Sequence, residues 1–151
     1  DALNCIALRP AMLNNIPILS VMTPHAGEFD RMFGPQPSSE ARLRKAIEMA
    51  KYYNILIILK GRHTAIVRPD GKIYFNSSGC PGMATPGSGD VLTGLLLAMM
   101  AQGYPAEIAS IIAVYIHGVA GEMAQAEQGV YGVTAGDIAA NIGRAIRETM
   151  K

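Results

Sequence analysis

The sequence feature that most constrains the fold is an uninterrupted apolar run, Asn54-Ile55-Leu56-Ile57-Ile58-Leu59. The run is too short to indicate a helix, and its isoleucines favour an extended backbone. Because it is apolar on both faces, it predicts a central strand of a sheet that is covered on both sides. The strand ends at Lys60-Gly61, so a lysine and a flexible backbone emerge at its carboxyl end, where open α/β sheets usually bind ligands.

Strand and helix patterns alternate around this run. Arg68-Pro69-Asp70-Gly71 is a strong turn signal and predicts a hairpin. The order favours an α/β layered domain with the sheet between helices. The predicted elements are a strand at 16–21, a helical turn at 29–33, a helix capped by Ser38 or Ser39, the strand at 54–59, a hairpin of 64–67 and 72–75, and helices at 90–102, 105–128 and 134 to the end.

Length and charge limit the function classes. The chain has 151 residues, half of them hydrophobic, which is the size of one domain with a sizeable core. Thirteen basic and twelve acidic side chains leave a net charge of +1. We therefore expect no nucleic-acid partner, which would need a basic surface, and no polybasic membrane patch.

Cysteine usage and hydropathy bear on the location of the protein. Cys5 and Cys80 have no paired metal-type spacing, so neither a disulfide framework nor a zinc site is expected, and a reducing cytoplasm is the default. The longest uncharged runs, 91–106 and 108–121, are interrupted and fall short of the roughly 18 to 20 apolar residues of a membrane span. Both runs predict buried helices, and no membrane partner is expected.

A glycine turn, Thr85-Pro86-Gly87-Ser88-Gly89-Asp90, leads directly into the apolar segment 91–97. It matches neither the dinucleotide fingerprint nor a Walker loop. It does place bare N–H groups and one carboxylate at the positive end of a helix dipole, which suits an anion. In the functional interpretation, the N–H groups of Gly87 to Asp90 stabilise a transferring phosphoryl group while Asp90 accepts a proton from a substrate hydroxyl. In the alternative, Asp90 is only a favourable charge worth about 0.5 kcal/mol.

The segment Lys60-Gly61-Arg62-His63-Thr64 follows the central strand and contains two cations. It predicts a nucleotide-phosphate contact through Lys60, the Gly61 backbone and the Thr64 hydroxyl. The alternative is a solvated strand end, which is a common place for lysine.

Of the three histidines, His25 is the main candidate for binding. His25 lies in Thr23-Pro24-His25-Ala26-Gly27-Glu28, where Pro24 fixes the loop and Gly27 permits a tight turn. A lone loop histidine more commonly caps a neighbouring carbonyl. His117 lies among apolar neighbours and is expected to be a core histidine. No metal site is expected from the histidines, because no i,i+4 pair occurs.

Together these segments resemble a known family. The matching blocks are, in chain order, Asp1 to Asn4, Thr23 to Phe29, Leu59 to Thr64 and Asn76 to Gly94. They look like the carboxyl-terminal part of an ADP/ATP-dependent NAD(P)H-hydrate dehydratase, a carbohydrate kinase-related family with the ribokinase-like fold. Four blocks in the right order over almost the whole chain are more specific than the Gly-x-Gly-Asp turn alone, which the wider ribokinase-like kinases share.

The resemblance implies a metabolite-repair enzyme. In this family ADP or ATP is thought to phosphorylate the hydroxyl of hydrated NADH or NADPH, after which phosphate leaves and the nicotinamide ring is restored. His25 and Asp90 would face the hydrated dinucleotide, with Asp90 as the base and Mg²⁺ offsetting phosphate charge. The anion hole would be formed by Gly87, Ser88 and Gly89, since Pro86 has no N–H to offer. The implied nucleotide contacts are Lys60, Gly61, Arg62, His63, Thr64 and Gly89.

The resemblance also bears on domain organisation. Residues 1–151 are expected to form a single, partial ribokinase-like nucleotide-binding domain. Asp1 to Asn4 resembles a mid-domain strand end, so the amino-terminal half of the three-layer α/β/α fold is expected to precede this chain, which alone is expected to be inactive. The oligomeric state is left open, with a homo-oligomer among the states considered.

Two other functions remain open at this point. One is a ribokinase-like small-molecule kinase acting on a sugar or a vitamin precursor, and the other is a non-catalytic nucleotide-binding module. The preferences between ADP and ATP, and between the hydrates of NADH and NADPH, are also left open.

Overall fold

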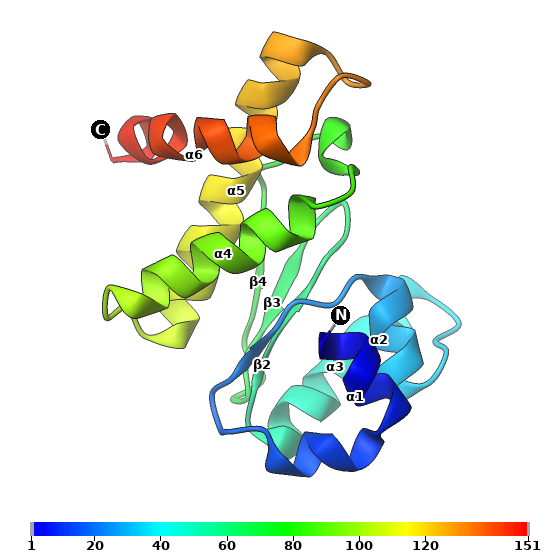
Figure 1. Cartoon of the computed structure of the whole chain (residues 1–151). Coiled ribbons are helices and arrows are strands. Elements are labelled where there is room, and N and C mark those ends of the chain that lie inside the picture. The colour runs from blue at the N-terminus through cyan, green and yellow to red at the C-terminus, as the bar shows by residue number, and fades with distance from the viewer. Residues whose placement is uncertain (1, 151) are drawn as a thin grey trace. The chain divides into compact units, whose positions relative to one another are not determined.

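The computed structural model describes residues 2–150, which form two compact units, one ending at Phe75 and the next beginning at Asn76. The first unit, blue to blue-green in Figure 1, combines helices with a four-stranded sheet. The second unit, green to red, is built of helices. The chain is therefore an α/β protein whose sheet lies entirely in the first unit.

The sheet of the first unit has the strand order β1-β2-β3-β4. The strands are β1 (Val21–Met22), β2 (Leu56–Leu59), β3 (Ala65–Val67) and β4 (Ile73–Phe75). β1 is parallel to β2, whereas β2 with β3 and β3 with β4 are antiparallel. The predicted central strand and hairpin are thus confirmed.

The helices of the first unit are α1 (Ala2–Leu8), the 3-10 helix η1 (Pro10–Asn15), α2 (Ala26–Phe33) and α3 (Ser39–Tyr53).

The core of the first unit forms where α2 and α3 pack with the sheet. Ala46 and Ala50 of α3 are fully buried together with Phe29 of α2 and Ile57 of β2. Ser38 caps α3 by accepting the Ala41 N–H, as predicted for this position. α2 ends at Phe33 and its C-cap is Gly34, whose φ of 87° is a conformation that glycine adopts without strain.

Two predictions at the start of the chain were wrong, one in the extent of a strand and one in the type of element. The strand predicted at 16–21 is limited to Val21–Met22, because Leu19 adopts a left-handed conformation with φ of 62° and its N–H donates to the Asn54 carbonyl. The segment 2–4, expected at a strand end, is the first turn of α1. Asp1 lies outside the described residues.

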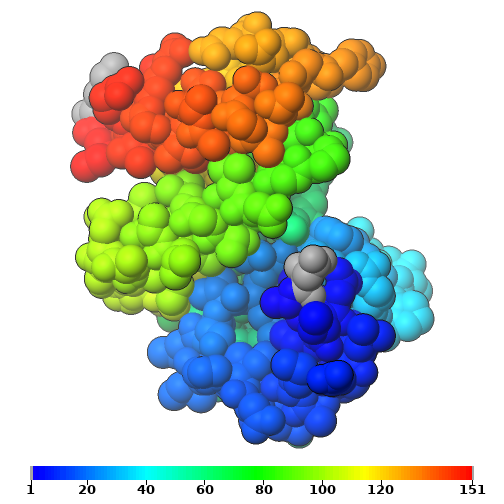
Figure 2. Space-filling view, viewed as in Figure 1, coloured from blue at the N-terminus to red at the C-terminus, as the bar shows by residue number. Residues whose placement is uncertain are grey.

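The second unit is organised around its longest helix. Its elements are the 3-10 helix η2 (Pro81–Met83), α4 (Ser88–Ala101), α5 (Ala106–Gln128) and α6 (Ala135–Thr149). α5 packs against both α4 and α6, and α4 and α6 lie side by side in the space-filling view (Figure 2). α6 begins with a capping box of Thr134 and Asp137, in which hydrogen bonds from Thr134 lower the pKa of the Asp137 carboxyl.

Alanines on α5 allow this close packing. Ala109, Ala113, Ala120 and Ala124 are all fully buried. By length and composition α5 could cross a membrane, with a mean hydropathy of 1.2 over an 18-residue window. Half of that window is buried within the protein, which is the environment of a core helix.

The glycine-rich loop before α4, residues 76–87, is hydrogen-bonded to α5. Ser78 Oγ donates to the Tyr115 carbonyl, and Gly79 N–H donates to Glu122 Oε1 at 2.7 Å. Gly82 N–H donates to Gln125 Oε1 at 2.9 Å. These hydrogen bonds hold the glycine-rich loop along one face of α5, and we call this loop the strap.

Glycines on α5 make room for this strap. A Cβ at Gly118 would lie 2.8 Å from the Ser78 carbonyl carbon, and a Cβ at Gly121 would overlap the Met83 side chain. We expect Gly118→Ala to lower the free energy of unfolding by about 1–3 kcal/mol, because the backbone of the strap would have to move. Urea denaturation measures this change.

The matched control is Gly143→Ala in α6, where nothing lies within 4 Å of the added Cβ. There we expect a gain of about 0.5–1 kcal/mol from helix propensity. Equal effects at the two positions would show that the close approach at Gly118 has no energetic weight.

Candidate functional site

The first group of predicted site residues lies where β1 and β2 end. Val21 pairs with Leu56, and the same parallel register continues to a bridge between His25 and Lys60. The Lys60 N–H donates to the Pro24 carbonyl at 2.8 Å. Backbone pairing therefore brings His25 and Lys60 side by side from two separate segments of the sequence.

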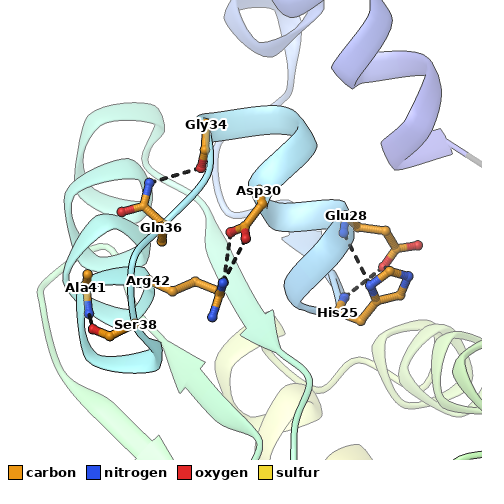
Figure 3. A network of polar contacts seen from close by, with 8 residues as sticks. All are labelled: His25, Glu28, Asp30, Gly34, Gln36, Ser38, Ala41 and Arg42. Carbon is orange, nitrogen blue, oxygen red and sulfur yellow. Dashed lines mark hydrogen bonds and ion pairs between the residues drawn. The ribbon is translucent and has the colours of Figure 1, made fainter.

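His25 is the N-cap residue of α2. Its Nδ1 accepts the Glu28 backbone N–H at 3.2 Å, and its own backbone N–H donates to Glu28 Oε2 at 2.7 Å (Figure 3). The two contacts form a capping box, with histidine where serine or threonine is usual. The ring remains 53% exposed, so capping does not remove it from solvent.

The Glu28 carboxylate lies between His25 and Lys60. Its Oε2 lies 3.7 Å from Lys60 Nζ and 3.5 Å from His25 Nε2. The Glu28 and Lys60 side chains are 18% and 25% exposed, which strengthens their attraction relative to a fully solvated pair. Glu28 was not among the predicted site residues, although the spacing His25-x-x-Glu28 is that of a capping box.

The segment after Lys60 forms a turn. Thr64 Oγ1 donates to the Gly61 carbonyl at 3.3 Å, which closes the turn. Nothing lies within 4 Å of the position a Gly61 Cβ would occupy, so the backbone there is open to a ligand. Arg62 and His63 are exposed at the tip of the turn. Because the Thr64 hydroxyl has one proton and donates it to the Gly61 carbonyl, a hydrogen bond to a phosphate oxygen would replace the turn contact.

The second group of predicted site residues lies at the start of α4. Gly87 has φ of 86°, and a Cβ there would lie 3.0 Å from that of Ala135, so glycine is required. The Ser88 N–H donates to the Thr85 carbonyl and the Asp90 N–H to the Gly87 carbonyl. Within the described residues, no backbone carbonyl accepts the N–H of Gly87 or Gly89. The turn thus offers two amides to an anion, next to the exposed Asp90 carboxylate in the first turn.

The Ser88 side chain points inward. It is 7% exposed, and its Oγ lies 3.4 Å from Nε2 of His117 on α5, which is also 7% exposed. The prediction of His117 as a core histidine is confirmed, with the addition that it supports the glycine turn. The Ser88 hydroxyl itself faces this support, away from solvent.

The helix that carries His25 is braced by an ion pair. Arg42 Nε and Nη2 donate to Asp30 Oδ1 and Oδ2 at 2.8 and 2.7 Å, joining α3 to α2 (Figure 3). The hydrogen bonds from Arg42 lower the pKa of the Asp30 carboxyl, against the opposing effect of burial. The Asp30 and Arg42 side chains are 24% and 15% exposed. These two hydrogen bonds fix the position of α2 against α3.

Comparison with known proteins places these groups in a family. The model of the NAD(P)H-hydrate dehydratase family matches residues 1–144. The chain belongs to the NAD(P)H-hydrate dehydratase family. A bifunctional NAD(P)H-hydrate repair enzyme from Moorella thermoacetica is 40% identical over 140 residues, which are 91% of this chain and 26% of that protein.

Solved structures give the fold of this dehydratase-family chain. An ADP/ATP-dependent NAD(P)H-hydrate dehydratase from Bacillus subtilis, co-crystallised with ATP and Mg²⁺, matches with a TM-score of 0.81 and 33% identity over 86% of this chain and 48% of that one. A ribokinase-like superfamily protein from Enterococcus faecalis matches with a TM-score of 0.79 and 26% identity over 97% of this chain and 50% of that one. The fold is ribokinase-like, and the chain spans about a quarter to a half of these relatives.

The Asp30–Arg42 pair predicts a pH-dependent stability. Asp30→Asn should lower the free energy of unfolding at pH 7 by about 1–2 kcal/mol, because Arg42 loses a charged acceptor. A lowered folded-state pKa stabilises the protein above the ordinary value of 3.8, and this contribution is lost as the pH falls through the folded-state pKa. Urea denaturation measures the free energy of unfolding of wild type and variant. The difference between the two should therefore shrink as the pH falls from 3.8 through the folded-state pKa of Asp30.

The control for this prediction is Glu48→Gln, which removes a surface ion pair with Lys45 on the same α3. We expect a change below about 0.5 kcal/mol. A constant Asp30→Asn difference across the acid range would contradict the role of the ionised pair.

Proposed function

We propose that the complete protein repairs hydrated NADH or NADPH, using ADP or ATP to phosphorylate the hydrate hydroxyl before phosphate is lost. The observation that carries this proposal is the start of α4, where two amides without a backbone acceptor adjoin an exposed carboxylate in a chain of the dehydratase family. The relative from Bacillus subtilis is described as ADP/ATP-dependent. We extend the proposal to a cytoplasmic location, without a nucleic-acid partner.

The proposed roles follow from the chemistry of each group. Asp90 takes the proton of the hydrate hydroxyl as that oxygen attacks the terminal phosphorus, and the N–H groups of Gly87 and Gly89 stabilise the transferring phosphoryl group. AMP or ADP leaves the terminal phosphorus in this transfer. The carbon–oxygen bond of the phosphorylated hydrate then breaks, phosphate leaves, and a proton is lost from the neighbouring ring carbon, which restores the double bond of the reduced ring.

The first unit supplies binding groups in this proposal. Lys60 and the Gly61 backbone bind nucleotide phosphate, with contributions from Arg62, His63 and Thr64, and His25 binds the hydrated dinucleotide. The Lys60 ammonium offers a positive charge to phosphate oxygens, and the accessible Gly61 backbone offers a hydrogen-bond donor.

Magnesium fits this site as a companion of the nucleotide. In the part of the chain that the structure describes, no group of three or more His, Cys, Asp or Glu side chains could hold a metal. Mg²⁺ commonly keeps several waters and binds through one or two carboxylates plus substrate phosphates. Asp90 is the carboxylate near the proposed phosphate site, and the ion would supply charge neutralisation there.

The test of the proposal is the recovery of reduced nicotinamide from its hydrate. The complete protein is incubated with hydrated NADPH, Mg²⁺ and either ADP or ATP, and the near-ultraviolet absorbance is followed. Recovery that needs the nucleotide supports repair. A stably phosphorylated sugar or vitamin precursor would instead indicate a ribokinase-like kinase, and nucleotide binding without any turnover would indicate a non-catalytic module.

Substitution of Asp90 separates chemistry from binding. Asp90→Asn should lower kcat by roughly 10² or more, the usual scale for losing a general base. Nucleotide affinity, measured by calorimetry, should stay within a few-fold, because the amides of Gly87 and Gly89 remain. Equal losses of binding and turnover would make Asp90 a structural residue.

Substitution of Lys60 tests the nucleotide contact. Lys60→Ala should weaken nucleotide binding by about tenfold or more, because a partly buried ammonium is lost from the phosphate site. Lys45→Ala on α3 is the control, since that lysine pairs with the exposed Glu48 on its own helix, and its loss should leave the affinity unchanged. Unchanged affinity for Lys60→Ala would remove this lysine from the site.

A further inference from the structure

We propose that His25 acts as a fixed hydrogen-bond donor, held by the α2 capping box in the neutral form protonated on Nε2, and not as a proton acceptor. Its ligand would be an oxygen of the bound substrate, either a hydroxyl or a phosphate oxygen. The assignment of His25 to the substrate rests on the proposed function, whereas the protonation form follows from the capping box alone.

The capping box decides which ring nitrogen carries the proton. His25 Nδ1 accepts the Glu28 N–H at 3.2 Å, so Nδ1 must present its lone pair. A neutral imidazole with an accepting Nδ1 carries its proton on Nε2. The reverse tautomer would direct two N–H groups at one another and leave an amide of the first turn of α2 without its cap.

The Nε2–H group remains available to a ligand. Nε2 lies 3.5 Å from Glu28 Oε2, beyond the roughly 2.7–3.2 Å of an N–H···O hydrogen bond. The His25 side chain is 53% exposed. The nitrogen that donates is thus the one not used by the helix.

Neighbouring groups confine the ring. A Cβ at Gly27 would lie 3.3 Å from His25 Cε1, so the ring lies close to the backbone of Gly27 in the first turn of α2. Glu28 Oε2 also accepts the His25 backbone N–H at 2.7 Å, which fixes the loop that carries the ring. Glu28 is therefore a positioning residue for His25.

Lys60 adds a second donor beside the first. Its Nζ lies 3.7 Å from Glu28 Oε2, the same oxygen that lies near His25 Nε2. Both nitrogens can donate a hydrogen bond to an oxygen of a ligand. They also leave proton removal to another residue, which agrees with Asp90 as the proposed base.

The first experiment observes the ring directly. Long-range ¹H–¹⁵N correlation spectra of the complete protein report each histidine tautomer, and the His25 signals are assigned as those lost in His25→Asn. We expect a non-protonated Nδ1 and a protonated Nε2 near neutral pH. A protonated Nδ1, or rapid averaging of the two tautomers, would overturn the proposal. This result does not depend on whether the protein repairs hydrated NADPH.

The second experiment separates capping from donation. In His25→Asn the amide oxygen can still cap α2, because asparagine is among the best N-cap residues, but no group reaches the Nε2 position. We expect a melting temperature within about 2 °C of wild type. We also expect KM for hydrated NADPH to rise about tenfold with little change in kcat, as for a lost binding contact.

The companion variant is His25→Ala, which loses both the cap and the donor. It should show the same rise in KM together with a lower melting temperature. Wild-type KM in His25→Asn would make His25 a cap only and would overturn its role as a donor. If the wild-type protein showed no repair activity while the spectra gave the expected tautomer, the proposed function would fail and the fixed tautomer would stand.

Discussion

The parallel pairing of β1 with β2 is the interaction on which the arrangement of His25 and Lys60 depends. It is short, yet its register continues through the His25–Lys60 bridge and the hydrogen bond from Lys60 to the Pro24 carbonyl. Parallel neighbours end at the same edge of a sheet, so a loop and a strand end from distant segments meet there. The capping box between His25 and Glu28 then fixes the orientation of the His25 ring at this edge.

The glycine turn before α4, in the second unit, depends on close backbone approach and not on strand pairing. Gly118 and Gly121 allow the glycine-rich strap to lie against α5, and α5 side chains accept the amides of the strap. His117, on the same helix, lies behind Ser88 in the first turn of α4. One helix thus supports both the strap and the turn, which leaves the Gly87 and Gly89 amides free to meet a ligand.

Sequence patterns predicted the elements whose cause is local. The strand predicted at 54–59 and the Pro69-Asp70-Gly71 hairpin turn each follow from a few neighbouring residues, and both are found, the strand at Leu56–Leu59. The strand at 16–21 was over-extended, because the bend at Leu19 is fixed by the distant Asn54 carbonyl. Likewise, the contacts of Glu28 with Lys60 and of Ser88 with His117 join segments far apart in the sequence, which periodicity cannot detect.

The histidine in the capping box links local structure to chemistry. Serine or threonine would satisfy the same amide of α2, and either has higher preference for an N-cap. Neither would carry a second polar atom outward once the cap is made. Histidine does, since its two nitrogens lie on opposite sides of Cε1 and only Nδ1 is used by the helix. A residue chosen for stability alone would not need that second nitrogen, and its exposed position beside Lys60 is the physical reason to assign it to a ligand.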